Sequence, residues 1–469
     1  MLSVKDVLEV TGGRLITGDV EHHFSGAVID SREAQPGDLF FPLEGEKDNG
    51  HRFILHALEK GAAGSLLEKK ELHHFGAVDF PAGKILIVVE NSLLSLQQLA
   101  RFHRSRFDIP LIAVTGSNGK TTTKDFVASV LSRRYDVLKT QGNLNNHIGL
   151  PLMLLGLNEA HEAAVLELGM SGFGEIALLA SLSSPTAGVM TNIGEAHLEQ
   201  LGSQENIARA KGELLEFMGP ESALFLNADD PHLCRMVEGF HGKIVTYGFT
   251  GKAHYRTVGY RSEDPGYGFE AVLSQKEKFR KETFWIPVPG RHNVYNALAA
   301  VAVGCYFDLT VEQIRLGLAQ ADVSSMRMER SLTKKGFWII NDAYNASPTS
   351  VKYALEFLVE WGGKHKKIAV LGDMLELGEV SEASHCEAGR YAAEIGIDYL
   401  VTFGELAEYM AQGAARAGLS LERIFPCKAH EDAIHCLEKL VEKDAIVLIK
   451  GSRGMKMEGI VEALTARYN

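Results

Sequence analysis

The chain has 469 residues, which is too long for one ordinary hydrophobic core and therefore predicts two or three domains. Apolar residues make up 45% and charged residues 23% of the chain, as in ordinary globular proteins. The formal net charge of −12 argues against general nucleic-acid binding. No segment has the ~20 apolar residues that a membrane span needs. We therefore expect a globular protein with no nucleic acid partner and no membrane insertion.

The cysteines give no sign of a disulfide framework or a metal site. They are five in number, scattered, and without C-x-x-C spacing: Cys234, Cys305, Cys386, Cys427 and Cys436. This pattern is typical of reduced, mostly buried thiols in a cytoplasmic protein. A metal-binding or catalytic cysteine is the less favoured interpretation.

Residues 1–90 form the first expected domain, in which short β-type runs surround a helical patch. The expected elements are strands at 27–29, 39–41 and 85–89 and a helix at 53–58. The second expected domain, 91–322, begins with an expected helix over residues 92–107.

Strand and helix patterns alternate regularly in this second domain, which predicts a parallel sheet with helices on both faces. The expected strands are 111–114, 164–168, 188–191, 223–227 and 244–247. Residues 251–286 interrupt the alternation and predict a β-hairpin excursion, after which GRHNVYNALAAVAVG begins a helix at a glycine turn. A third alternating block, within residues 323–469, has expected strands at 337–340, 368–371, 399–402 and 445–449.

The strongest functional signal is the segment LIAVTGSNGKTTTKDFVASVL, which predicts a strand, a tight turn and an amphipathic helix. The turn contains Gly116 and Gly119, whose flexibility lets backbone N–H groups close around phosphate oxygens at a helix N-terminus. Lys120 can reach the β- and γ-phosphates, and Thr121 or Thr122 can offer a hydroxyl to Mg²⁺. Two residues rather than the usual four separate the glycines. An ordinary glycine turn is the alternative, but GKTTT at the start of a helix favours nucleotide binding.

Charged side chains follow several of the expected strands, at the sheet edge where open α/β sheets bind ligands. Glu167 ends one strand, and a phosphate loop one strand away favours Mg²⁺ ligation over a merely solvent-facing charge. His197 follows the next strand, and Asp342 and Lys450 end strands of the third block. Each alone could be an ordinary surface residue, but their repeated position at strand ends indicates a site.

Four further candidates complete the set. Asn293 and Asn296 are three residues apart, so one helix face holds both, and they could read an adenine edge or simply cap the helix start. Lys211 lies on an expected helix, where a solvated lysine is the default interpretation. Arg327 could pair with phosphate as a bidentate donor.

In their order along the chain these motifs resemble those of the Mur ligases, the ATP-dependent ligases of peptidoglycan precursor synthesis. The resemblance covers essentially the whole chain and rests on TGSNGKTTT, ELGM, TNIGEAHLE, AKGEL, GRHNVYNALAA, the Arg327 segment and NDAYN. Four segments most resemble the branch that joins D-alanyl-D-alanine to UDP-N-acetylmuramoyl-tripeptide: IDSREAQPGDLFFPLEGEKDNGHRF, QGNLNNHIGLP, LGDMLELG and KGSRGMKME. The branch that adds the third residue usually has a DNPR-type element, which this sequence lacks. Folylpolyglutamate synthases usually have Gly-Ser after the loop lysine.

The resemblance implies an α/β fold of three domains. A small α/β N-terminal domain, residues 1–90, would bind the uridine diphosphate end of the substrate. A central P-loop-type domain, residues 91–322, would bind ATP on a mostly parallel sheet with helices on both faces. A Rossmann-like C-terminal domain, residues 323–469, would close over the site and bind the incoming amine. The family also implies a cytoplasmic monomer.

The resemblance also implies a role for each matching residue. The nucleotide loop would hold the ATP phosphates with Gly116, Ser117, Asn118, Gly119, Lys120, Thr121 and Thr122. Thr121 and Glu167 would bind one Mg²⁺, and His197 would support a second. Lys211 matches a lysine that CO₂ carbamylates, which turns a cation into a carboxylate-like metal ligand.

The remaining implied contacts involve the nucleoside and the other substrates. Asn296 would read adenine with Asn293 nearby, Arg327 would contact the γ-phosphate and Asp342 the ribose. The implied catalytic residues are Lys120, His197, Lys211 and Arg327. The implied substrate residues are Ser31 and Arg32 near the uridine diphosphate, Asn145 and Asn146 at the nucleotide sugar, and Asn345 and Lys450 near the dipeptide or the closing domain.

The implied reaction explains why cations should outnumber general bases in this site. Transfer of the ATP γ-phosphoryl group to the tripeptide carboxylate would give an acyl phosphate, which the dipeptide amine would attack with loss of phosphate. Such a transfer depends on positioning and charge neutralisation. Two alternatives remain: a sister Mur-type or folylpolyglutamate-type ligase with another acceptor, and a non-catalytic ATP-binding scaffold. A GTPase is disfavoured because no NKxD element is present.

Overall fold

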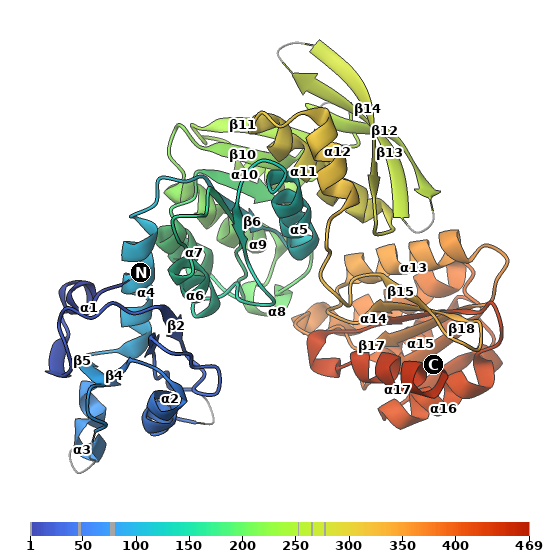
Figure 1. Ribbon diagram of the computed structural model, residues 1–469. Coiled ribbons are helices and arrows are strands. Elements are labelled where there is room, and N and C mark those ends of the chain that lie inside the picture. Colours follow the sequence, from blue (N-terminus) through green and yellow to red (C-terminus); the bar gives the residue numbers. More distant parts are fainter. Residues whose placement is uncertain are drawn as a thin grey trace.

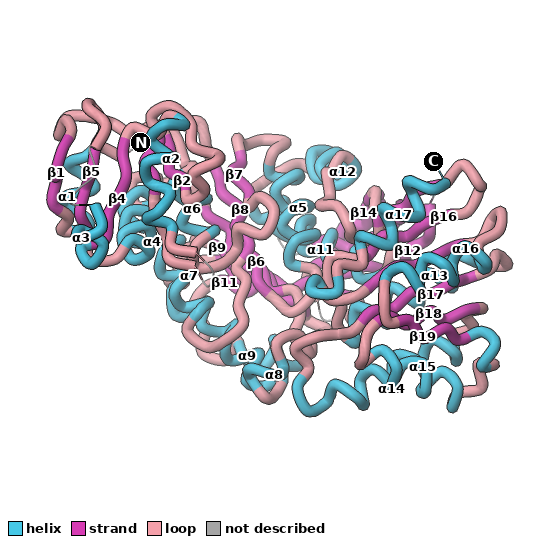
Figure 2. The backbone as a smooth tube through the Cα atoms, turned by 90° about the horizontal axis from the view of Figure 1, so that it is seen from below, coloured by secondary structure: helices cyan, strands magenta, loops and turns pink. Residues whose placement is uncertain are grey.

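The computed structural model describes residues 2–45, 48–75, 80–251, 253–263, 266–275 and 278–468. Three sheets with their helices follow one another along the chain (Figure 1). Viewed from below, the N-terminal and C-terminal sheets lie at opposite ends with the central sheet between them (Figure 2). The expected three-part α/β architecture is confirmed.

The N-terminal sheet has five strands in the order β1-β5-β4-β3-β2, and only the β1–β5 pair is antiparallel. Its strands are β1 (Arg14–Thr17), β2 (Gly26–Val28), β3 (Asp38–Phe40), β4 (Gly64–Glu68) and β5 (Ile85–Val89). Its helices are α1 (Val4–Thr11), η1 (Gly50–Phe53), α2 (Ile54–Lys60), η2 (Lys69–Glu71) and α3 (Leu72–Phe75).

The central sheet has nine strands in the order β14-β13-β12-β11-β10-β9-β6-β8-β7. Pairing is parallel from β7 to β12 and antiparallel from β12 to β14. Its strands are β6 (Leu111–Thr115), β7 (Val137–Lys139), β8 (Ala163–Glu167), β9 (Ala187–Met190), β10 (Ala223–Asn227), β11 (Lys243–Gly248), β12 (Tyr255–Glu263), β13 (Gly266–Gln275) and β14 (Lys278–Ile286).

The expected hairpin excursion at 251–286 is in fact a three-stranded extension of the central sheet. A short parallel pairing, Tyr247 with Tyr255 and Gly248 with Arg256, joins β12 to β11. Residues 252, 264–265 and 276–277 of this segment lie outside the described residues.

Two hydrophobic clusters cover the two faces of the central sheet. Helices α5 and α11 pack together on one face, and α4, α6, α7 and α9 belong to the cluster on the other, which continues into the N-terminal sheet. The helices of this region are α4 (Ser92–Arg104), α5 (Lys120–Leu131), α6 (Gly149–Leu155), α7 (Glu175–Ser183), α8 (Leu198–Leu201), α9 (Gln204–Gly212), η3 (Glu213–Phe217), α10 (Pro231–Met236), α11 (Arg291–Tyr306) and α12 (Val311–Ala319).

The C-terminal sheet has six strands in the order β15-β16-β20-β17-β18-β19, and only β15 is antiparallel to its neighbour. Its strands are β15 (Glu329–Leu332), β16 (Trp338–Asp342), β17 (Lys367–Gly372), β18 (Tyr399–Phe403), β19 (Ile424–Cys427) and β20 (Ile446–Lys450). Its helices are α13 (Pro348–Gly362), η4 (Gly378–Val380), α14 (Ser381–Glu394), α15 (Ala407–Arg416), η5 (Leu421–Arg423), α16 (His430–Leu440), η6 (Arg453–Met455) and α17 (Glu458–Tyr468).

The cysteines only partly follow the sequence expectation. All five lie in the described part of the chain, where none forms a disulfide. Cys305 and Cys427 are buried, Cys386 and Cys436 are partly buried, and Cys234 is exposed. The expectation of a mostly buried set was therefore wrong. Across the described ranges, no helix is long and apolar enough to cross a membrane.

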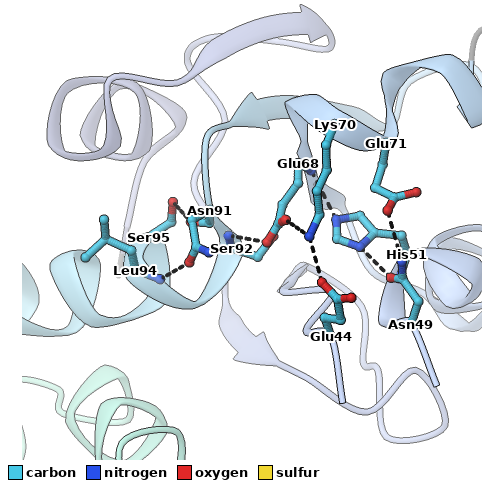
Figure 3. Close-up of polar contacts among 10 residues, drawn as sticks. All are labelled: Glu44, Asn49, His51, Glu68, Lys70, Glu71, Asn91, Ser92, Leu94 and Ser95. Carbon is cyan, nitrogen blue, oxygen red and sulfur yellow. Dashed lines mark hydrogen bonds and ion pairs between the residues drawn. The ribbon is translucent and has the colours of Figure 1, made fainter. Parts of the chain in front are cut away.

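A buried polar network fixes the N-terminal unit to the helix that leads into the central one (Figure 3). His51 is 2% exposed; its Nε2 accepts the backbone N–H of Glu68 at 3.1 Å, and its Nδ1 lies 2.7 Å from Asn49 Oδ1. Only a neutral ring with the proton on Nδ1 satisfies both contacts. Glu68 Oε1 in turn accepts the backbone N–H of Ser92 at the start of α4 (2.8 Å).

The burial of His51 predicts a loss of stability in mild acid. Burial lowers the pKa of His51 below its ordinary value of 6.5, and it does the same for His103 and His385. Below about pH 6.5 the unfolded chain binds protons that the native state excludes, so stability decreases as the pH falls from about 6.5 toward the lowered pKa values and levels off below them. We expect the thermal midpoint of unfolding to decrease at pH values below about 6.5. The His51→Gln substitution should make this decrease with pH less steep.

The substitution should also cost about 1–3 kcal/mol at neutral pH, since it disturbs the acceptor of a buried N–H group. Calorimetry over a pH series measures both effects, with the exposed His73→Gln as control. Parallel pH profiles for the wild-type protein and His51→Gln would contradict the assignment.

Candidate active site

The ends of the central and C-terminal parallel strands meet around one cavity of about 590 Å³. Of the residues expected from the sequence, those that line it are Ser117, Asn118, Gly119, Lys120, Thr121, Thr122, Asn145, Asn146, Glu167, His197, Asn293, Asn296, Arg327, Asp342, Asn345 and Lys450. Gly116 precedes the lining segment. Ser31 and Arg32 belong to the N-terminal unit and do not line this cavity. The structure thus gathers most of the predicted nucleotide and metal residues in one place.

The nucleotide loop follows β6 directly and needs glycine at two positions. Gly116 and Gly119 have φ angles of 147° and 79°, a region that favours glycine. A Cβ atom would lie 1.9 Å from Thr191 Oγ1 at Gly116 and 2.5 Å from Asn296 Oδ1 at Gly119. Close packing against β9 and α11 therefore fixes the loop that the sequence predicted.

Lys120 is folded over this loop at the start of α5. Its Nζ donates to the carbonyl oxygens of Gly116 (2.8 Å) and Ser117 (3.3 Å). Burial lowers the pKa of Lys120, the Glu167 carboxylate opposes that effect, and the Arg327 guanidinium adds to it. A phosphate ligand would offset both the energetic cost of burying the ammonium and its repulsion by Arg327.

Several buried polar atoms of cavity residues have no protein partner among the described residues. They include Asn118 Nδ2, Glu167 Oε2, His292 Nδ1 and Arg327 Nε. Buried polar groups without partners are costly, so such a cluster indicates a ligand with complementary groups. Phosphate oxygens can accept from the Asn118 and Arg327 donors, and a divalent cation can bind the unpaired Glu167 oxygen. The other oxygen of Glu167 accepts from Asn145 Nδ2 at 2.9 Å.

Arg327 connects the C-terminal unit to the nucleotide loop. Its Nη2 donates to Thr121 Oγ1 at 2.7 Å, and its guanidinium carbon lies 4.2 Å from the centre of the Tyr344 ring. The guanidinium therefore lies beside the hydroxyl that the sequence assigns to Mg²⁺. A γ-phosphate at this point would contact both groups, which agrees with the expected position of Arg327.

Lys211 on α9 is buried behind the cavity lining, with a relative exposure of 1%. The sequence default of a solvated lysine is therefore wrong. Burial, and to a lesser degree the Lys120 ammonium, lower the pKa of Lys211 well below its ordinary value. Only a neutral amine can react with CO₂, and a lowered pKa favours that form. Carbamylation would replace a repelled cation with an anion.

Asn293 and Asn296 are both buried near the start of α11. Neither caps the helix, because its N-cap is Gly290, which makes no side-chain capping bond. Asn296 Nδ2 donates to Asn293 Oδ1 at 3.0 Å, and Asn296 Oδ1 accepts from Thr123 Oγ1 at 3.1 Å. The capping alternative is thus wrong, and the adenine contact stays a prediction.

Asp342 and Lys450, taken as separate strand-end charges in the sequence, form an ion pair. They face each other in the parallel pairing of β16 and β20, and Lys450 Nζ lies 2.6 Å from Asp342 Oδ2. Lys450 also donates to the Asn345 carbonyl at 2.8 Å, and Asp342 Oδ1 accepts the Met328 N–H at 3.2 Å. The contacts of Asp342 with ribose and of Lys450 with the dipeptide stay predictions.

The N-terminal candidates lie in a separate part of the molecule. Ser31 Oγ is 2.9 Å from His56 Nδ1, and the exposed Arg32 pairs with Asp30 at 2.6 Å. The Arg32 guanidinium lowers the pKa of Asp30 to about 2. Their assignment to the uridine diphosphate stays a prediction.

Sequence reasoning missed several polar residues at the junction of the central and C-terminal units. Ser347 Oγ donates to Asn118 Oδ1 at 3.0 Å, and Thr349 Oγ1 donates to Glu195 Oε2 at 2.9 Å. Asn192 is the third, since its side-chain oxygen accepts the Asn118 N–H at 3.0 Å. The TNIGEAHLE motif pointed to Asn192 and Glu195, whereas the serine and threonine looked like ordinary helix-start residues.

Comparison with known proteins gives the same assignment along the whole chain. Residues 23–104 match the Mur ligase family catalytic domain, 114–304 the Mur ligase middle domain and 326–453 the Mur ligase glutamate ligase domain. The chain is 40% identical to UDP-N-acetylmuramoyl-tripeptide--D-alanyl-D-alanine ligase of Bacillus subtilis, with 98% of each chain covered. It is 31% identical to the enzyme of that name from Escherichia coli K12, over 99% of this chain and 98% of the relative.

Comparison with solved structures supports the same family assignment. MurF from Acinetobacter baumannii superposes with a TM-score of 0.87 at 29% identity, covering 99% of this chain and 98% of that one. MurF from Thermotoga maritima in complex with ADP gives 0.80 at 28% identity, covering 94% and 97%. A Mycobacterium tuberculosis folylpolyglutamate synthase with ADP gives 0.62 at 16% identity, covering 80% and 94%, and shares the fold alone. This chain belongs to the Mur ligase family.

Proposed function

We propose that this protein is the ATP-dependent ligase that joins D-alanyl-D-alanine to the terminal carboxylate of UDP-N-acetylmuramoyl-tripeptide. The product would be UDP-N-acetylmuramoyl-pentapeptide for peptidoglycan synthesis. The observation that most supports this function is the 40% identity to the Bacillus subtilis ligase over 98% of both chains. The cavity supports it independently, because its unpaired donors and its Glu167 oxygen suit a nucleotide phosphate with a divalent cation.

The chain's own residues would perform the phosphoryl transfer mainly by positioning and charge neutralisation. Loop N–H groups and Lys120 would hold the phosphates, and Arg327 would neutralise charge that develops on the transferred group. Thr121, Glu167, His197 and a carbamylated Lys211 would hold Mg²⁺ at two sites. The Mg²⁺ ions would supply Lewis-acid charge neutralisation at the phosphate oxygens.

The three units would divide the substrates between them. Residues 1–90 would bind the uridine diphosphate end through Ser31 and Arg32, and residues 91–322 would bind ATP. Residues 323–469 would close over the site and bring in the dipeptide amine near Asn345 and Lys450. Asn145 and Asn146 would lie along the nucleotide sugar, and Asn296 and Asp342 at the adenine and ribose. The enzyme would act as a cytoplasmic monomer, in the compartment that supplies ATP.

Product analysis tests the function directly. The protein is incubated with Mg²⁺, ATP and UDP-N-acetylmuramoyl-tripeptide ending in either lysine or diaminopimelate, and mass spectrometry identifies the product. The acceptors are D-alanyl-D-alanine, single D- and L-amino acids, and glutamate with a folate. We expect a pentapeptide product with D-alanyl-D-alanine only, and the preferred tripeptide identifies the natural third residue. Ligation of glutamate to the folate would instead establish a sister ligase.

Lys120→Ala should abolish ATP turnover, with a loss on the order of 10²–10³-fold or more, because an essential charge at the phosphates is removed. The Lys120 ammonium donates its hydrogen bonds to loop carbonyls, so circular dichroism should show an unchanged fold. Lys428→Ala, at a lysine 86% exposed, is the control. Retention of a substantial fraction of wild-type turnover by Lys120→Ala would refute the loop assignment.

Lys211→Ala should be inactive but recover activity when acetate, propionate or formate is added, because its proposed role is that of a carbamate. The truncated side chain leaves space behind the lining for a small carboxylate. Activity is measured against carboxylate concentration, with Lys120→Ala as a variant that should not respond. Normal activity of Lys211→Ala without added carboxylate would rule the carbamate role out.

A further inference from the structure

Two loops from different units are joined beside the cavity. One loop, residues 191–199, follows β9 of the central sheet and includes the first residues of α8, and the other, residues 373–378, follows β17 of the C-terminal sheet and ends at the start of η4. Glu376 Oε2 lies 2.6 Å from His197 Nδ1, and the Glu199 N–H donates to the Glu376 carbonyl at 3.0 Å. The contact therefore combines a close approach of the two side chains with a backbone hydrogen bond across the junction.

The backbone of both loops adopts an uncommon conformation at this contact. His197 and Glu376 have φ angles of 66° and 63°, which few residues other than glycine adopt. Gly378 approaches Glu199 so closely that a Cβ would lie 3.1 Å from its Cα. Conformations of this kind persist only where the surrounding structure enforces them, and they are frequent at functional sites.

Two backbone hydrogen bonds hold the loop that contains Glu376 in place just before that residue. The Met374 N–H donates to Nε2 of the buried His385 at 2.9 Å. The Leu375 N–H donates to Ser452 Oγ, also at 2.9 Å. These bonds fix the position of Glu376 within the C-terminal unit.

The loop that contains His197 is bonded to the nucleotide loop in the same way. The Ser117 N–H donates to the Asn192 carbonyl at 2.8 Å, and the Gly194 N–H donates to Ser117 Oγ at 2.9 Å. His197 itself lines the cavity that also contains Glu167. His197 therefore both lines the nucleotide site and contacts the C-terminal unit.

A carboxylate that accepts the Nδ1 proton of an imidazole fixes the tautomer and the ring orientation. The Nε2 lone pair is then free to bind a metal ion, and the carboxylate raises its basicity. We infer that Glu376 is a positioning residue that prepares His197 for the second Mg²⁺ when the C-terminal unit closes. The inference rests on the proposed function, in which His197 supports that ion. Because the two residues belong to different units, closure and metal binding would be coupled.

The alternative is an ordinary surface ion pair, since the Glu376 side chain is 47% exposed. Such a pair would add little stability and would not change the affinity of the site for metal. Metal affinity therefore separates the two interpretations, whereas a change in activity alone would not.

The experiment measures Mn²⁺ binding by electron paramagnetic resonance on the full chain with a non-hydrolysable ATP analogue and UDP-N-acetylmuramoyl-tripeptide. We expect two Mn²⁺ ions per wild-type chain. Glu376→Ala should keep the first and bind the second about 10- to 100-fold more weakly. Glu376→Gln, which retains a side-chain acceptor, should recover part of the affinity. Glu379→Ala removes an exposed carboxylate of the same segment and should match the wild type.

Unchanged affinity of the second site in Glu376→Ala would overturn the inference, as would equal losses in Glu376→Ala and Glu379→Ala. A wild-type chain that binds a single Mn²⁺ but forms the pentapeptide would overturn the inference and leave the proposed function standing. Failure to form product from any tripeptide would overturn the proposed ligase function, whatever the Mn²⁺ affinities of the variants. Thermal unfolding of each variant checks that the fold is retained.

Discussion

The burial of cationic side chains beside the nucleotide loop is the constraint on which this site depends. Burial lowers the pKa of both Lys120 and Lys211; the Arg327 guanidinium adds to the effect at Lys120, and the Glu167 carboxylate opposes it. Such an arrangement is unfavourable by itself and becomes favourable when anions enter it. Nucleotide phosphate and a carbamate on Lys211 would supply those anions, and Mg²⁺ would then bind between them.

The fold places this cluster where two units can enclose it. The adjacent parallel strands β6 and β9 bring the nucleotide loop and the loop 191–199 to one edge of the central sheet. The C-terminal unit then contacts the nucleotide loop through Arg327 on Thr121 and the loop 191–199 through Thr349 on Glu195. An acyl phosphate hydrolyses in water, so enclosure protects the reaction that the charges promote.

How much could be predicted from the sequence depended on whether the signal was local. The buried strands β6 and β10 are uninterrupted apolar runs, and the nucleotide loop is a contiguous motif, so both were predicted. The edge strands β1, β7, β15 and β19 are short and partly exposed, and their weak patterns were missed. The pair Asp342–Lys450 depends on the order of strands, and the pair His197–Glu376 depends on how two units meet. No local pattern contains that information.

The sequence default failed most instructively at Lys211, whereas His197, equally unremarkable on its own, was assigned to the site from its position after a strand. Lys211 has a helical position like that of a solvated lysine, but tertiary packing buries it beside Lys120. His197 has a loop position like that of a surface residue, but its φ angle is 66° and its Nδ1 lies 2.6 Å from Glu376 Oε2. In both cases the surroundings would change the chemistry of a common side chain, toward a carbamate and an oriented ligand. Both changes would require groups from other elements, so no single motif contains the information needed to predict them.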